Sequence, residues 1–190
     1  MYFATDPVAL DKTGLKVIDA MSQLEVPDGI ELWTIQTVNP DGVAMDTRGN
    51  ARGVDLNRNF ATANWASVSA GTDRYSGPSA ASEPETQAAQ AFLDELRPTL
   101  VVIWHQVGNH VDDNHSVARY DLLEAFAMYV GMSRVVTPCG GALCVATATQ
   151  YINGKGGATA FTVELPSSVS TALANRQAGG FLRTAALLAG

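Results

Sequence analysis

Apolar and polar residues follow two patterns along this chain, and the segments that carry them interleave. Apolar residues at helical spacing predict helices at residues 14–24, 82–96, 116–131 and 171–190. Alternating or continuously apolar runs predict strands at residues 30–38, 99–104 and 159–166. Interleaved strands and helices favour an α/β fold: a mixed, largely parallel, twisted sheet with helices on both faces.

Local signals set the expected ends of these elements. Ser82 is the predicted N-cap of the second helix, with Glu85 completing a capping box, and Gly131 is expected to end the third helix. The stretch "NPDG" at 39–42 predicts a turn. The forty residues after it are rich in Gly, Asn, Ser, Ala and Asp and predict a long structured loop, which in a compact domain usually carries function.

Length and charge narrow the function classes. The 190 residues predict a single domain, 1–190, with one sizeable core. The formal net charge of -7 argues against nucleic acid as a partner, and no apolar run reaches the length of a membrane span. Because the N-terminus lacks a signal peptide, the chain as printed is expected in the cytoplasm; a secreted or periplasmic location would require a leader upstream. Cys139 and Cys144 fit either a small-loop disulfide or two idle thiols.

Polar residues stand where the predicted strands end, which is where open α/β sheets bind ligands. Arg48, Asn57 and Arg58 lie in the loop after the first predicted strand. His105 directly follows the second strand, and Glu164 lies inside the otherwise apolar third strand. These residues are the candidates for chemistry.

Each candidate leaves two interpretations open. The stretch "GVDLNRNF" at 53–60 fits an Asx-rich turn, or a fork of donors that binds a carboxylate. A buried Glu164 needs a partner, so it is either half of a structural ion pair or a general base whose pKa is tuned by burial. His105 is either a hydrogen-bonded core residue or a metal ligand or acid–base group.

Four segments together resemble one family. They are "TVNPDGVAMDTRGNARGVDLNRNF", "YSGPSAASEPETQA", "VVIWHQ" and "FTVELP", in the order and roughly the spacing of the zinc metallocarboxypeptidases, the carboxypeptidase A-like peptidases. The resemblance covers about residues 14–166 and is closer to bacterial members, including those that trim peptidoglycan peptides. It implies a carboxypeptidase-like α/β/α sandwich, a Zn²⁺ cofactor and a peptide substrate with a free C-terminal carboxylate.

The same resemblance implies a role for each candidate. Asn57 and Arg58 match the pair that grips the substrate's C-terminal carboxylate, and Arg48 best matches the arginine that stabilises the developing oxyanion. His105 matches the second zinc histidine. Glu164 matches the glutamate that takes a proton from zinc-bound water and passes it to the leaving amine.

The first zinc motif departs from the family pattern. Its His-x-x-Glu should fall at about residues 8–11, where the chain reads Val-Ala-Leu-Asp, and no histidine precedes His105. Asp11 could stand in for the glutamate with a shorter reach. The family's first strands are also expected to be missing, because few residues precede this point. The N-terminus is therefore read as incomplete or as carrying a degenerate zinc motif.

Two further parts of the sequence are candidates for the site. The segment "GNHVDDNH" at 108–115 could coordinate a metal, but a solvated polar loop is the favoured interpretation. Tyr151 is the nearest match to a tyrosine that many family members place on a mobile loop, but its spacing fits poorly, and it receives no role.

Two function hypotheses follow. The first is a zinc-dependent metallocarboxypeptidase-like hydrolase that removes the C-terminal residue of peptides, including cell-wall peptides. The second is a catalytically impaired pseudo-peptidase that binds peptide C-termini without turnover. The metal content of the protein separates them.

Overall fold

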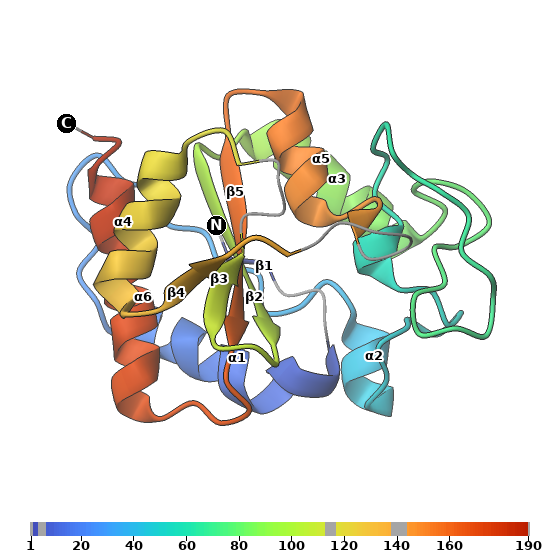
Figure 1. The fold of residues 1–190 in the computed structure, drawn as a ribbon, viewed down its shortest axis with the longest axis horizontal. Coiled ribbons are helices and arrows are strands. Elements are labelled where there is room, and N and C mark those ends of the chain that lie inside the picture. Colours follow the sequence, from blue (N-terminus) through green and yellow to red (C-terminus); the bar gives the residue numbers. More distant parts are fainter. Residues whose placement is uncertain (1, 4–6, 113–116, 138–143, 190) are drawn as a thin grey trace.

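A five-stranded sheet in the order β1-β2-β5-β3-β4 forms the centre of the computed structural model (Figure 1). The structure describes residues 2–3, 7–112, 117–137 and 144–189, with side chains from residue 14 onward. The strands are β1 Tyr2–Phe3, β2 Leu100–Gln106, β3 His110–Asp112, β4 Ser133–Val135 and β5 Thr159–Leu165. Of the strand pairs in these residues only β3–β5 is antiparallel. The predicted mixed, largely parallel sheet is confirmed.

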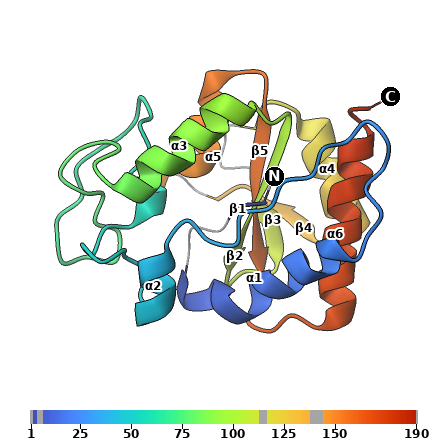
Figure 2. The same cartoon turned by 180° about the vertical axis from the view of Figure 1, so that it is seen from behind.

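Helices cover both faces of this sheet, as predicted (Figures 1 and 2). They are α1 Pro7–Ser22, α2 Pro40–Met45, the 3₁₀ turn η1 Leu56–Arg58, α3 Pro84–Leu96, α4 Tyr120–Val130, α5 Ala148–Lys155 and α6 Thr171–Ala186. Side chains alternate between the two faces of β2: Trp104 belongs to the core under α1, α4 and α6, and Ile103 to the core under α3 and α5. Every residue of β2 from Leu100 to His105 is buried, which explains its continuously apolar sequence.

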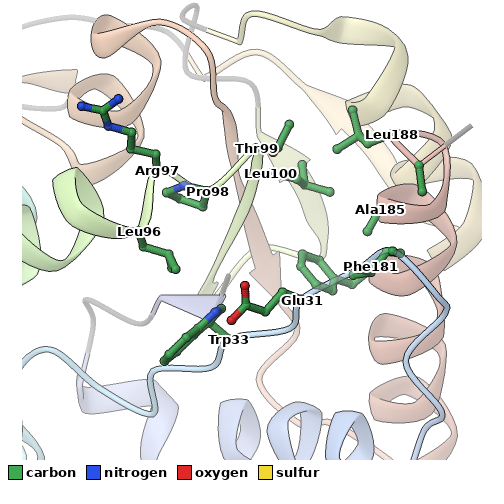
Figure 3. A pocket seen from close by; sticks show the side chains of 13 residues that line it. Glu31, Trp33, Leu96, Arg97, Pro98, Thr99, Leu100, Phe181, Ala185 and Leu188 are labelled. Carbon is green, nitrogen blue, oxygen red and sulfur yellow. The ribbon is translucent and has the colours of Figure 1, made fainter.

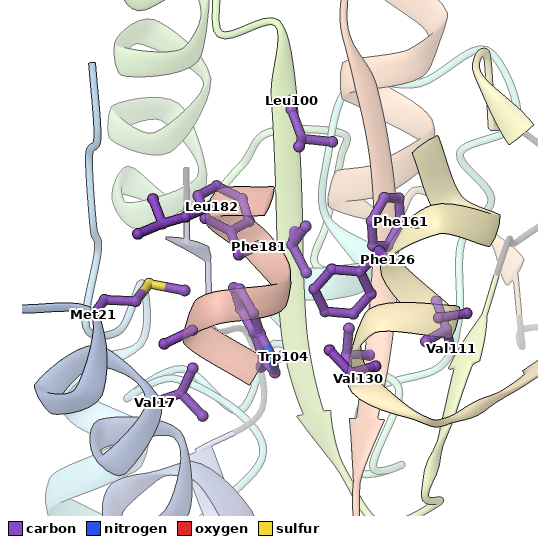
Figure 4. Close-up of a cluster of buried hydrophobic side chains, with 14 of the residues drawn as sticks. Val17, Met21, Leu100, Trp104, Val111, Phe126, Val130, Phe161, Phe181 and Leu182 are labelled. Atoms are coloured by element: carbon purple, nitrogen blue, oxygen red, sulfur yellow. The ribbon is translucent and has the colours of Figure 1, made fainter. Parts of the chain in front are cut away.

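Aromatic rings fill the larger core (Figure 4). The ring of Trp104 lies 6.4 Å from that of Phe126 on α4 and 6.0 Å from that of Phe181 on α6, measured between centroids. The Trp104 indole N–H donates to the Gln177 side-chain oxygen at 3.1 Å, so burial leaves this polar group satisfied. β2 is thereby fixed against two helices, and the end of the strand that carries His105 is fixed with it.

Glycine allows α4 and α6 to approach closely. A Cβ added to Gly180 would lie 2.5 Å from Cγ1 of Val130, a distance that no real side chain tolerates. Glycine lowers the intrinsic stability of a helix interior, but at position 180 it allows this close approach of α4 and α6. Gly131, with φ of 66°, ends α4 in the left-handed conformation, as predicted.

The predicted strand at 30–38 is wrong. Only Thr34 in this segment forms a bridge, and the remaining residues are irregular. Its apolar side chains do contact the two cores while partly buried; they are Ile30, Leu32, Ile35 and Val38. The alternation therefore reflects which side chains face the core. The edge of β2 away from β5 is paired with β1 at Val102 and Ile103, so the segment adds no strand at that edge.

Two predicted ends are also corrected. "NPDG" begins helix α2 rather than a turn: the Asn39 side chain accepts from the Gly42 N–H at 2.9 Å, and Pro40 occupies the first turn. Helix α3 has Glu83 as its N-cap and no capping box, because the Ser82 hydroxyl donates to the Glu83 carboxylate instead of accepting from the helix.

The favoured solvated-loop interpretation of "GNHVDDNH" is wrong for its described part. His110–Asp112 form β3, which pairs with both β4 and β5, and Val111 and Asp112 are buried. Asp113 and His115 lie outside the described residues. Cys144 forms a disulfide, while Cys139 also lies outside the described residues. Within the described part of the chain, no helix has both the length and the apolar character needed to cross a bilayer.

Candidate functional site

A cleft of about 290 Å³ lies at the carboxyl ends of β2 and β5, on the face covered by α3 and α5. We call it the carboxyl-edge cleft; its lining residues are Arg48, Asn57, Arg58, Arg74, His105, Gln106, Val107, His110, Asp112, Thr137, Thr147, Thr162 and Glu164. Five of the six residues singled out from the sequence line it. The sixth, Asp11, lies in α1, and its side chain is not among those described.

His105 and Glu164 are neighbours across the sheet. They are partners in the parallel β2–β5 register, so their side chains leave the same face. The His105 Nδ1 atom is 3.9 Å from the Glu164 Oε1 atom, which is too long for a hydrogen bond but close enough for strong electrostatic coupling. The sequence predicts a fully buried Glu164; its side chain is instead 22% exposed, because it stands near the end of β5 and reaches the cleft.

Burial lowers the pKa of His105 below its ordinary value of 6.5. The negative charge of Glu164 opposes this shift, and the positive charges of Arg48 and Arg58 reinforce it. At neutral pH the imidazole is therefore neutral, the form that keeps a lone pair for a proton or a metal.

Asp55 organises the arginine-bearing loop, and sequence reasoning missed it. Its fully buried carboxylate accepts from the Arg48 Nε–H at 2.9 Å and from the Asn57 backbone N–H at 3.0 Å. The second contact caps η1, so the Asx-turn interpretation of "GVDLNRNF" describes its backbone. The signal was an Asp two residues before an Asn, which is too common in surface turns to stand out.

Asn57 and Arg58 are held in place from beneath. The Asn57 side-chain oxygen accepts from the Ala148 backbone N–H at 2.9 Å, and that contact fixes which end of the amide carries the N–H groups. Arg58 is buried, and its Nη1 donates to the Asn57 carbonyl at 2.6 Å. The two residues therefore place amide and guanidinium donors side by side at the start of α5.

Three other polar residues enter the cleft without having been predicted as members of one site. Arg74 reaches it from the long loop and is exposed. His110 pairs with Glu164 on the side away from His105, so Glu164 lies between two histidines. Gly108 packs against the side chains of Glu164 and His110. A Cβ at this position would lie 2.5 Å from the Glu164 Cβ and 2.7 Å from the His110 Cε1 atom. Asp112 lies two residues beyond His110 on β3.

Tyr151 lies elsewhere. It is in α5, where its hydroxyl bonds to the Asp94 carboxylate at 2.9 Å, and it does not line the carboxyl-edge cleft. Lys155 bonds to the same carboxylate at 2.8 Å.

The described residues do not form a zinc site of the expected kind. A catalytic zinc ordinarily takes three protein ligands and one water. Among the residues whose side chains are described, no three His, Cys, Asp or Glu groups come close enough to hold a metal. Asp11, Asp113 and His115 are outside that set.

Comparison with known proteins places the chain among peptidases. Murein peptide amidase A of Escherichia coli strain K12 is 39% identical over 103 residues, which are 48% of this chain and 43% of that protein. The enzyme of the same name from Vibrio campbellii is 35% identical over 91 residues, 42% of this chain and 36% of that protein. The chain thus matches less than half the length of these curated relatives.

Solved structures share the fold over nearly the whole chain. The murein-tripeptide amidase of Escherichia coli O157 superposes with a TM-score of 0.73 at 25% identity, covering 98% of this chain and 79% of that one. Carboxypeptidase A of Helicoverpa armigera gives a TM-score of 0.74 at 21% identity, covering 100% and 60%. The family model described as zinc carboxypeptidase matches residues 24–123, which are 100 of the 190 residues. By that match, the chain belongs to the zinc carboxypeptidase family.

Proposed function

We propose that the carboxyl-edge cleft binds the C-terminal residue of a peptide through its free carboxylate, and that cell-wall peptides are the substrate class. One observation carries the proposal: Asn57 and Arg58, held by their own backbone contacts, share a cleft with Arg48, His105 and Glu164. The relatives named for murein peptides support the choice of cell-wall peptides.

The proposed carboxylate grip follows from donor geometry. A guanidinium offers a planar fork that matches both oxygens of a carboxylate, and a neighbouring amide adds a further donor. Because Arg58 is buried, its charge is poorly screened by water, and an anion entering the cleft interacts with it strongly. The N-terminus of α5, which begins at Ala148 beside Asn57, adds the positive end of a helix dipole.

Two residues are proposed to act at the peptide bond next to that carboxylate. Arg48, oriented by Asp55, stabilises negative charge on the carbonyl oxygen. Glu164, partly exposed at the cleft, takes a proton from water and delivers it to the leaving amine.

Turnover is a separate matter from binding. Zinc, when bound in this family, supplies an acidified water and polarises the carbonyl. Peptide hydrolysis is the first candidate, supported by the family match and by the His105–Glu164 pair, whose side chains leave the same face of the sheet. Binding of peptide C-termini with little turnover is the second candidate, because the described side chains form no three-ligand group.

The two candidates are separated by measuring binding and release together. A murein tripeptide and an unrelated peptide are titrated into the purified protein, and the mixtures are then incubated with zinc and analysed for a freed C-terminal residue by mass spectrometry. Steady release supports the first candidate, and binding with only trace release supports the second. Absence of binding and release contradicts both.

A further inference from the structure

A groove of about 530 Å³ lies between helices α3 and α5, where each helix ends and the chain continues toward its strand. We call it the α3–α5 groove. Because α3 leads into β2 and α5 leads into β5, the groove lies at the amino ends of these parallel strands, opposite to the carboxyl-edge cleft (Figures 1 and 2). Its volume is within the roughly 300–1,000 Å³ of small-molecule sites. No described residue lines both the groove and the cleft.

Apolar side chains form much of the lining of this groove. Leu93 on α3 and Ile152 on α5 are buried, and both line it. Pro98 and Ala158, which precede the two strands, continue the apolar lining. The apolar body of a ligand would lose contact with water against these side chains, which favours binding.

The charged side chains that line the groove are Asp94, Arg97 and Lys155. The Lys155 ammonium group donates to the Asp94 carboxylate at 2.8 Å, and the Tyr151 hydroxyl bonds to the same carboxylate at 2.9 Å. The hydrogen bond from Lys155, together with the charge of Arg97, helps to lower the pKa of Asp94, so this carboxylate is ionised at neutral pH. Asp94 therefore offsets one of the two cations and leaves one positive charge in the groove.

Arg97 supplies the positive charge that is left over. Within the described part of the chain, its guanidinium forms no hydrogen bond and no ion pair. Figure 3 shows it pointing away from Glu31 and Trp33. Arg97 also ends α3 in the left-handed conformation, with φ of 48°, which glycine adopts with less strain. The chain thus places an arginine with free donors at the groove although glycine would suit the backbone better.

We propose that the α3–α5 groove binds a small organic carboxylate with an apolar body. The acidic group interacts with Arg97 and Lys155, and the apolar body lies against the apolar lining. A guanidinium can bind both oxygens of a carboxylate through two parallel hydrogen bonds. The C-terminal ends of two helices lie here, and their partial negative charge opposes an anion, so the attraction must come from these side chains. The inference does not depend on the proposed function, because the groove and the cleft share no described residue.

The test titrates 2-naphthoate and its neutral amide, 2-naphthamide, into the ¹⁵N-labelled protein and follows the backbone amide resonances by NMR. Shifts at residues 156–158 report binding in the groove, which these residues line. Shifts at Asn57 and Arg58 report binding in the carboxyl-edge cleft. 2-Naphthoate is expected to shift residues 156–158 and to bind there about 10-fold more tightly than 2-naphthamide, because only the acid carries the charge that Arg97 attracts.

Three variants sharpen this test. Arg97→Gly removes the guanidinium and suits the left-handed backbone, so the protein should fold while its preference for the acid over the amide at residues 156–158 largely vanishes. Asp94→Asn removes the negative charge of the groove, so 2-naphthoate should bind more tightly than to the unmodified protein. Arg183→Ala removes an exposed arginine on α6 and should leave both affinities unchanged.

Several results would overturn the inference. They are equal affinities of the acid and the amide at residues 156–158, and a preference for the acid that survives in Arg97→Gly. Shifts confined to Asn57 and Arg58, or no shifts at all, overturn it as well. Arg58→Ala should abolish any shifts in the carboxyl-edge cleft and leave those at residues 156–158 unchanged, so the groove and the cleft are tested separately.

Discussion

Two hollows of nearly equal size lie at opposite edges of the sheet, and their chemistry differs. The carboxyl-edge cleft has a volume of about 290 Å³. The second, which we call the amino-edge hollow, has about 320 Å³ and is lined by Gly29, Ile30, Glu31, Trp33, Leu96, Arg97, Pro98, Thr99, Leu100, Phe181, Ala185, Leu188 and Ala189 (Figure 3). Volume alone would not tell them apart.

Most side chains that line the amino-edge hollow are apolar, and its two charged residues do not converge. In Figure 3 the Glu31 carboxylate lies beside Trp33, whereas the Arg97 guanidinium points away from it. In the carboxyl-edge cleft, by contrast, Asp55 binds Arg48 and the Asn57 backbone, and Asn57 in turn binds the start of α5.

Chain direction explains the difference. β2 and β5 run parallel, so the residues at their carboxyl ends come together, and the N-terminus of α5 points to the same place. The amino end of β2 meets the C-terminal part of α6, where Ala185 and, just beyond the helix, Leu188 supply apolar side chains. Converging and mutually oriented charges therefore mark the functional site better than size does.

The largest expected effect concerns zinc. If the residues outside the described set add no ligands, the purified chain should hold well under one zinc per molecule after dialysis, because its described residues offer no three-ligand group. Loss of even an outer partner costs roughly 10- to 100-fold in metal affinity, and loss of a direct ligand costs more. Elemental analysis checks this. One tightly held zinc per chain would show that side chains outside the described set complete a site.

Arg58→Ala should produce the next largest effect. Removing the buried guanidinium should weaken binding of peptides with a free C-terminus by about 2–5 kcal/mol, because the substrate carboxylate loses its charged partner. Amidated peptides should be little affected. Arg97→Ala is the matched control at the amino-edge hollow and should change neither affinity. Equal losses in the two variants would erase the contrast between the two regions.

Asp55→Asn should have an intermediate effect. Asparagine keeps an oxygen that can cap η1 through the Asn57 N–H, but it removes the charge that orients Arg48. Affinity for free-acid peptides should fall by about 1–3 kcal/mol, the range for hydrogen bonds to charged groups. Circular dichroism should show an unchanged fold. Full affinity in this variant would mean that Arg48 needs no partner to reach its position.

The smallest effect belongs to a charge cluster outside both regions. Hydrogen bonds from Lys155 and Tyr151 lower the pKa of Asp94 below its ordinary value of 3.8. A carboxyl group whose pKa is lowered by folding stabilises the fold at pH values above its ordinary pKa. This stabilisation is lost as the pH falls through the lowered pKa. Because the Asp94 carboxylate and the Lys155 ammonium group are largely exposed, Asp94→Asn should reduce the melting temperature only slightly at pH 7. The difference in melting temperature between this variant and the unmodified protein should shrink below pH 3.8. Peptide affinity should not change; a loss would extend the site to this charge cluster.

The strands that carry the site were predictable from sequence, and several of its contacts were not. Buried strands such as β2 and β5 are recognisable in the sequence as continuous apolar runs. His105 and Glu164 could therefore be placed at the carboxyl edge of the sheet. β3 and β4 have three residues each, too few to show a period, and their partners are distant in sequence. The segment 30–38 shows the converse, since it has the alternation of a strand but only Thr34 forms a bridge.

The residues of the site divide in the same way, into those with a clear sequence pattern and those defined by contacts between distant segments. Arg48, Asn57 and Arg58 were found through a long and specific sequence pattern. Asp55 and Asp112 make contacts that only the fold reveals, namely the ion pair of Asp55 with Arg48 and the hydrogen bonds of Asp112 with Thr137. A single aspartate in a polar stretch carries no signal of burial, and here both are buried.

The most direct test of the carboxylate grip is calorimetry of the unmodified protein with one peptide in two forms, free acid and C-terminal amide. If Arg58 and Asn57 bind the terminal carboxylate, the free acid should bind at least about 30-fold more tightly than the amide, or roughly 2 kcal/mol, because only the acid carries a negative charge at its C-terminus. The advantage should shrink as salt is raised. Equal affinities for the two forms would contradict the proposal that Asn57 and Arg58 bind the terminal carboxylate.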